Sequence, residues 1–267
     1  MFKYFSFITC ITLLLASCHS ASEKQADKAI PLPAAEKQLR DEIAAHPDSI
    51  ILQEKLIQYF RDNGNYSQAT AETNQLLKKD SNNVRLLYIH AMLLSENGDT
   101  LQAIPAWEKL VHIDPRPENI VSLGTLYSLT KNPLALKAAD YLLSIANPQA
   151  QSKASFIKAL YYANADEKNK AIDFFDKCLQ LDYSYLPAYR EKAICLYDIG
   201  KPVDALKVLE LSNTINKTNE EAYYWIGRCY EKLGKKEAAI QNYQTALQLV
   251  PDFVEAKDAL ARLGQIQ

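Results

Sequence analysis

The chain has 267 residues and a formal net charge of −2, from 30 Lys and Arg against 32 Asp and Glu. Because the charges nearly balance and no Arg-rich stripe occurs, the chain lacks the clustered positive field that non-specific nucleic-acid binding requires. Beyond the N-terminus no apolar run is long enough to cross a bilayer as a helix.

Residues 1–17 have the pattern of a secretory signal, with one Lys ahead of an apolar run too short to span a bilayer. Residues 15–18 read Leu-Ala-Ser-Cys, which resembles the bacterial lipobox. The resemblance implies cleavage before Cys18 and attachment of diacylglycerol to it, followed by acylation of the new amine. Two or more acyl chains anchor a protein stably. The alternative is an ordinary signal peptide cut nearby.

Residues 18–33 are polar and contain two prolines, so we expect a lipidated flexible tether. His19 rather than Asp follows Cys18. In well-studied envelopes this pattern resembles that of outer-membrane lipoproteins. We therefore expect a protein anchored by lipid in the bacterial outer membrane and facing the periplasm.

Residues 34–49 have the pattern of a single helix, and after them alanines recur every 34 residues with one beat missing. Glycines precede four of these alanines by five residues, and large apolar residues follow four of the five alanines by four residues. A fixed period of this length indicates a repeat solenoid. The recurring alanines are Ala69, Ala103, Ala171, Ala205 and Ala239.

The clearest copy, residues 220–253, resembles the tetratricopeptide (TPR) repeat: its aromatic, Gly, Ala and Pro positions agree in type and spacing. The resemblance covers residues 50–253 as six units. It implies an all-α fold, a TPR-type α-solenoid in which helix-turn-helix repeats form a right-handed superhelix. Independently, each unit holds two apolar stretches of helical period separated by a turn, and stacked units bury these faces in one continuous core. The units begin at Ile50, Val84, Glu118, Ser152, Leu186 and Glu220.

The third unit is irregular, because Lys137 occupies the alanine position and Pro133 lies in the turn. This irregularity predicts a kink or a weak joint in the stack, or reflects neutral drift of a degenerate repeat, which we favour. Residues 254–267 carry an apolar face and a charged face, as expected for a C-terminal capping helix.

Three cysteines remain after the signal and the lipidation site: Cys178, Cys195 and Cys229. Equivalent positions in neighbouring repeats usually lie beyond disulfide reach, although Cys178 could approach Cys195. We interpret all three as buried free thiols that pack as small apolar residues.

No catalytic constellation is present, since the histidines lack metal-ligand spacing and no nucleophile or phosphate-binding motif occurs. We therefore expect no enzyme activity, no metal and no cofactor.

The resemblance places the first helix of each unit on the concave face, where TPR proteins bind peptides or partner helices. Tyr and Arg dominate binding energy at interfaces, so we expect the partner-binding residues at the positions of that face. Phe156, Arg190 and Tyr224 are predicted to form a row there, with Arg228 one turn beyond Tyr224. The alternative is that these side chains pack against each other or lie in water. The candidate residues are Arg190, Tyr224, Arg228, Phe156, Tyr88 and Arg85.

Two functions remain. The first is a lipid-anchored adaptor of the bacterial envelope, a scaffold that binds an envelope protein. The second is a helical lipoprotein that captures nutrients or glycans on aromatic side chains such as Trp107 and Trp225. We favour the adaptor, because repeats fill the chain and leave no insertion able to build a pocket.

Overall fold

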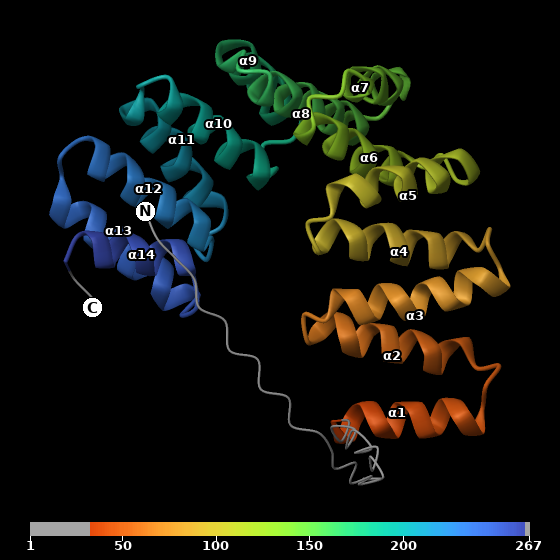
Figure 1. The fold of residues 1–267 in the computed structure, drawn as a ribbon. Coiled ribbons are helices and arrows are strands. Elements are labelled where there is room, and N and C mark those ends of the chain that lie inside the picture. The colour runs from red at the N-terminus through yellow and green to blue at the C-terminus, as the bar shows by residue number, and fades with distance from the viewer. Residues whose placement is uncertain (1–32, 265–267) are drawn as a thin grey trace, which may run out of the picture.

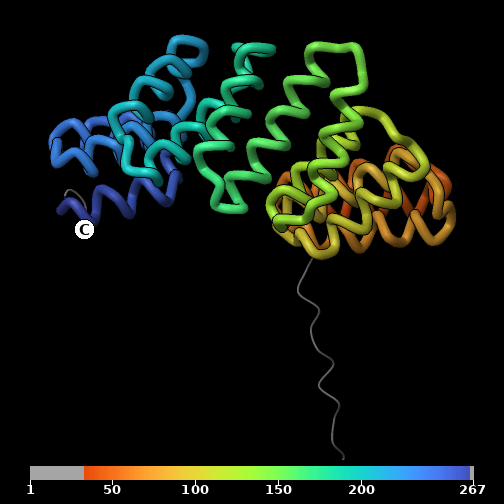
Figure 2. The backbone as a smooth tube through the Cα atoms, turned by 90° about the horizontal axis from the view of Figure 1, so that it is seen from above, coloured from red at the N-terminus to blue at the C-terminus, as the bar shows by residue number. Residues whose placement is uncertain are grey.

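The computed structural model describes residues 33–264, which form fourteen helices and no strand. The all-α solenoid predicted from the sequence is confirmed. Figure 1 shows the helices stacked in chain order into an arch; in Figure 2, seen from above, the red to yellow helices overlap at one end of it and the blue helices lie at the other. The helices are α1 (Ala34–Ala45), α2 (Ile50–Asp62), α3 (Tyr66–Lys79), α4 (Val84–Glu96), α5 (Thr100–Ile113), α6 (Pro117–Leu129), α7 (Leu134–Ser144), α8 (Pro148–Asn164), α9 (Lys168–Leu181), α10 (Leu186–Asp198), α11 (Pro202–Ile215), α12 (Glu220–Lys232), α13 (Lys236–Leu249) and α14 (Val254–Arg262).

Side-chain caps begin several helices. Asn65, Asn83, Asp99 and Asn219 each accept a hydrogen bond from a backbone N–H of the first turn, which satisfies a donor that the helix itself cannot. The turn inside each unit needs a residue in the left-handed region, and Gly200 provides it between α10 and α11 with φ +78°. Local sequence therefore sets the start of these four helices and the end of α10.

Small residues at one phase of the first helix let the second helix of the unit approach. Ala91, Ala159 and Ala193 are buried at this phase, and Gly227 takes the same place in α12. The side chains packed near them come from the second helix, as in Trp107 of α5 and Tyr243 of α13. The buried apolar residues of the described chain form five clusters that follow one another along the stack.

The third unit is closely packed rather than weakly joined. The helix α8 begins at Pro148, four residues before the expected start of its unit, and contacts α6, α7 and α9. Ser128 of α6 donates to the carbonyl of Ile157 of α8 at 3.0 Å. Because α8 begins at Pro148, it is longer than the other first helices, and it packs against both helices of the third unit.

Candidate functional site

The first helices of neighbouring units lie close together. The helices α6, α8, α10 and α12 contact one another in sequence, whereas no two consecutive second helices among residues 33–264 are in comparable contact. Because the inner side of a curved stack is the shorter side, these first helices line the concave face.

Arg228 of α12 is held on this face by three aromatic rings. Its guanidinium carbon lies 5.4 Å from the ring centroid of Tyr197, 5.8 Å from that of Tyr224 and 5.4 Å from that of Trp225. It donates hydrogen bonds to the hydroxyls of Tyr224, at 3.0 Å, and Tyr197, at 3.4 Å. We call these four residues the Arg228 cradle. Cation–π attraction and the two hydrogen bonds fix the orientation of the guanidinium.

Lys232 extends the positive charge one turn along α12. Its Nζ donates to the Tyr197 carbonyl at 2.7 Å and lies 4.0 Å from the Tyr197 ring centroid. Nearby carboxylates are engaged elsewhere, since Glu231 pairs with Arg262 and Asp198 pairs with Lys168. Within residues 33–264, neither Arg228 nor Lys232 forms an ion pair with a carboxylate.

Arg190 is placed differently from Arg228, because two carboxylates already pair with its charge. Its Nε donates to Glu191 at 3.0 Å, and an Nη1 hydrogen bond joins it to Glu221 of the next first helix. Arg85 and Glu54 form the same kind of pair, also 31 residues apart, with the charges exchanged. These pairs join neighbouring repeats and leave Arg190 little charge to offer a ligand.

The predicted row of Phe156, Arg190 and Tyr224 does not form as a continuous surface. Phe156 is only 6% exposed, with its ring centroid 5.0 Å from that of Tyr185 and 5.9 Å from that of Phe175. The expectation that Phe156 faces a partner is therefore wrong. Tyr224 is half-buried, and its ring packs near Phe253, but its hydroxyl reaches Arg228 as the one-turn spacing predicted.

The other two candidates lie on α4. Tyr88 is 40% exposed and meets Trp107 edge to face at 5.7 Å between centroids. Arg85 lines a groove of about 270 Å³ between α2 and α4, together with Glu54, Gln58 and Met92. Of these two candidates, Arg85 therefore lines a groove between neighbouring first helices, and Tyr88 is exposed beside Trp107.

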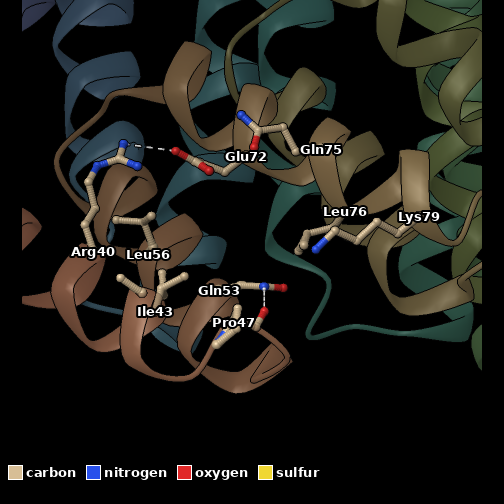
Figure 3. Close-up of a pocket in the computed structure, with 10 residues that line it drawn as sticks. Arg40, Ile43, Pro47, Gln53, Leu56, Glu72, Gln75, Leu76 and Lys79 are labelled. Atoms are coloured by element: carbon tan, nitrogen blue, oxygen red, sulfur yellow. Dashed lines mark hydrogen bonds and ion pairs between the residues drawn. The ribbon is translucent and has the colours of Figure 1, made fainter.

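A hollow of about 350 Å³ between α1, α2 and α3 was not predicted. Figure 3 shows Ile43 and Leu56 on one side of it and Leu76 on another. Arg40 donates to Glu72 at 3.0 Å across its edge, and Gln53 donates to the Pro47 carbonyl at 2.7 Å.

A second hollow of about 330 Å³ repeats this site four units later, between α9, α10 and α11. Asp176, Leu179 and Leu211 occupy the positions that Arg40, Ile43 and Gln75 occupy in the first. The sequence already held the relation between the two hollows, because each residue named from the second lies four repeat lengths after its equivalent in the first. Both hollows lie over a first helix between two second helices, where a curved stack opens on its outer side.

The remaining expectations concern chemistry and anchoring. Cys178, Cys195 and Cys229 are free and buried, as predicted, and burial raises the pKa of each thiol to about 11. In residues 33–264 no cluster of His, Cys, Asp and Glu is arranged to hold a metal ion, and no helix is long and apolar enough to cross a membrane. Cys18, the signal and most of the tether lie outside the described residues.

Comparisons with known proteins match the repeats directly. The tetratricopeptide repeat models match residues 152–185 and 220–253, the bounds expected for the fourth and sixth units. An inactive peptidyl-prolyl cis-trans isomerase, shutdown, of Bombyx mori is 27% identical over 55% of this chain and 39% of its own length. A TPR repeat-containing protein of Methanocaldococcus jannaschii is 26% identical over 74% of this chain and 36% of its own length. The chain spans less than two-fifths of these curated relatives.

Solved structures share the architecture. A tetratricopeptide repeat protein from Parabacteroides merdae has a TM-score of 0.72 at 20% identity, over 86% of this chain and 91% of that one. PilW, a type IV pilus biogenesis factor, has a TM-score of 0.59 at 18% identity, over 78% of this chain and 97% of its own. At these identities the likeness concerns the fold. The two matched segments identify tetratricopeptide repeats within this chain, and the solved structures show that it shares the fold of tetratricopeptide repeat proteins.

Proposed function

We propose that this protein is a lipid-anchored scaffold of the bacterial cell envelope that binds a partner protein on its concave face. TPR proteins generally mediate protein–protein interaction, which supports a protein partner. The observation that carries the proposal is the Arg228 cradle, because Arg and aromatic side chains with unused bonding capacity are typical centres of binding energy. The lipobox at residues 15–18 supports the anchor.

A crosslinking experiment in the native bacterium tests the binding face. A photoreactive amino acid at Ile194 of α10, the repeat position equivalent to Arg228, is compared with one at Leu211 of α11. Leu211 is exposed on a second helix and serves as the control. We expect a discrete protein adduct from position 194 alone. An adduct from position 211 alone would move the site to the outer hollows, and the absence of any protein adduct would favour capture of a small ligand.

Fractionation of the Cys18→Ser variant tests the anchor. We expect the wild-type protein in the outer-membrane fraction and the variant in the soluble periplasmic fraction, because a serine hydroxyl does not accept the diacylglycerol that a lipobox cysteine accepts. If the variant still sediments with the outer membrane after a salt wash, either the lipobox assignment is wrong or a partner holds the protein there.

A further inference from the structure

The guanidinium of Arg228 has bonding capacity that no described residue uses. An arginine carries five N–H donors, and Arg228 directs hydrogen bonds only to the hydroxyls of Tyr224 and Tyr197. Both acceptors are phenol hydroxyls, and no carboxylate among residues 33–264 forms an ion pair with the guanidinium, although the charge of Glu231 attracts it from farther away. Arginine remains protonated at every pH at which a protein stays folded. The charge is therefore permanent, and no described carboxylate contacts it directly.

The surroundings of Arg228 preorganise its side chain for binding an anion. Arg228 is half-buried and lies near three rings, so its side chain is already ordered and partly stripped of water. An anion that binds there meets a donor whose rotamer freedom is already lost, which lowers the entropic cost of binding. Aromatic rings interact with guanidinium groups through their faces, while the N–H edge of a guanidinium matches the two oxygens of a carboxylate.

Lys232 extends the positive charge of the site toward the C-terminal end of α12. It lies one helical turn beyond Arg228 and shares the ring of Tyr197 with it. Toward the other end of α12, Arg190 and Glu221 form an ion pair that neutralises the surface. Positive charge is thus concentrated between α10 and the C-terminal half of α12, beside the exposed parts of aromatic side chains.

We propose that the Arg228 cradle is a receptor for a carboxylate side chain of an acidic peptide segment that lies across α10 and α12, with Lys232 contacting a second acidic group. The inference rests on the proposed function and specifies the chemistry of the partner. Charge complementarity selects this occupant: neither cation forms an ion pair with a carboxylate among residues 33–264, and the rings beside them suit an aliphatic or aromatic neighbour of the acidic residue.

The test uses the full chain and a displayed library of random twelve-residue peptides. Peptides retained by the wild-type protein are sequenced, and one is synthesised with its preferred acidic residue intact and with that residue changed to its amide. We expect Asp or Glu to be enriched at a fixed position. We expect the amide peptide to bind the wild-type protein about tenfold more weakly, the usual scale for one charge-assisted hydrogen-bonded pair.

The Arg228→Gln variant closes a double-mutant cycle. We expect it to bind the acidic peptide about tenfold more weakly than the wild type does, yet to bind the acidic and amide peptides equally. Arg116→Gln is the matched control, because Arg116 is an exposed arginine paired with Asp114 at the turn before α6. It removes the same charge and should leave both affinities unchanged. The comparison of the acidic and amide peptides uses the wild-type protein, so it remains informative even if the Arg228→Gln variant does not fold.

The outcomes separate the two proposals. Retained peptides with no acidic preference, or an acidic preference that Arg228→Gln leaves unchanged, would overturn the carboxylate receptor and leave the scaffold function standing. If the wild-type protein retains no peptide above background, the proposed peptide-binding function fails and this inference fails with it.

Discussion

Gly227 of α12 lies directly against the ring of Tyr243 of α13. A Cβ atom at position 227 would stand 2.5 Å from Cε1 and 2.7 Å from Cδ1 of that ring. Tyr243 is completely buried, and its hydroxyl donates to Glu231 at 2.8 Å. The ring therefore has no space into which to withdraw, and glycine is the residue that allows these two helices to meet.

We expect Gly227→Ala to destabilise the protein by about 1–3 kcal/mol, the usual range for overpacking a core. Alanine is favoured over glycine by about 1 kcal/mol in a helix interior, so the clash must first offset that gain. Urea unfolding followed by circular dichroism measures the difference. A variant as stable as the wild type would show that the α12–α13 contact can relax.

Gly124→Ala is the matched comparison. A Cβ there would stand 2.9 Å from Cδ1 of Ile157 and 3.2 Å from the Cβ of Ala138. Both distances are longer than those at position 227, and the nearer atom is the terminal methyl of an isoleucine rather than part of a rigid ring. We therefore expect a smaller loss of stability than for Gly227→Ala, and the reverse order would contradict the packing argument.

The turns inside the units offer a stabilising substitution. Lys131 and Asp166 have φ values of 57° and 66° at the turns of the third and fourth units, where Gly200 and other glycines serve elsewhere. A non-glycine residue in the left-handed region is strained by roughly 1–2 kcal/mol. We expect Lys131→Gly to raise the free energy of unfolding by up to about 1 kcal/mol, since the added freedom of glycine in the unfolded chain offsets part of the relief.

Gly200→Ala provides the opposite change. An added Cβ at position 200 meets no atom within 4 Å, so only the backbone conformation opposes it. We expect a loss of about 1 kcal/mol, measured by the same denaturation. If both substitutions shift stability in the same direction, the φ argument does not explain these turns.

The sequence predicted the solenoid well because its alanines recur at a constant spacing of 34 residues, with one position missing. Ala69, Ala103 and their equivalents are fully buried, as the 34-residue spacing required. It did not predict how the third unit compensates for its irregularity. That outcome depends on the length of α8 and on the Ser128–Ile157 hydrogen bond, which joins two units.

The candidate site was only partly predictable for a similar reason. The one-turn spacing predicted that Arg228 lies beside Tyr224, since an i, i+4 relation is local, and the two side chains are hydrogen-bonded. It could not show that Glu221 pairs with Arg190, because that depends on the offset between neighbouring helices. Nor could it show that Tyr185, in the turn before α10, covers Phe156.

Because Phe156 is a core residue, we expect Phe156→Ala to reduce stability by about 3–5 kcal/mol, the range for removing a buried phenylalanine. Tyr88→Ala, at the same repeat position but exposed, should have a much smaller effect. Thermal unfolding compares the two variants. Equal, small effects would mean that Phe156 contributes little to packing and would restore it as a candidate for partner contact.

Glu231 links the last three helices, because it accepts hydrogen bonds from Tyr243 of α13 and from Arg262 of α14. Burial opposes its charge and raises the pKa, but these hydrogen bonds and the charge of Arg262 outweigh burial and hold the pKa below its ordinary value of 4.5. A carboxyl whose pKa is depressed by folding contributes stability above its unfolded pKa. That contribution is lost as the pH falls through the lower, folded value.

We therefore expect the thermal midpoint of the wild-type protein to fall as the pH is lowered below 4.5, and the fall to be shallower in Glu231→Gln. The amide cannot titrate, so the variant should be less stable than the wild type near neutral pH and approach it in acid. Glu237→Gln, at an exposed position of α13, is the control and should follow the wild-type curve. Parallel curves for the wild type and Glu231→Gln would show that the helix link does not depend on the charge of Glu231.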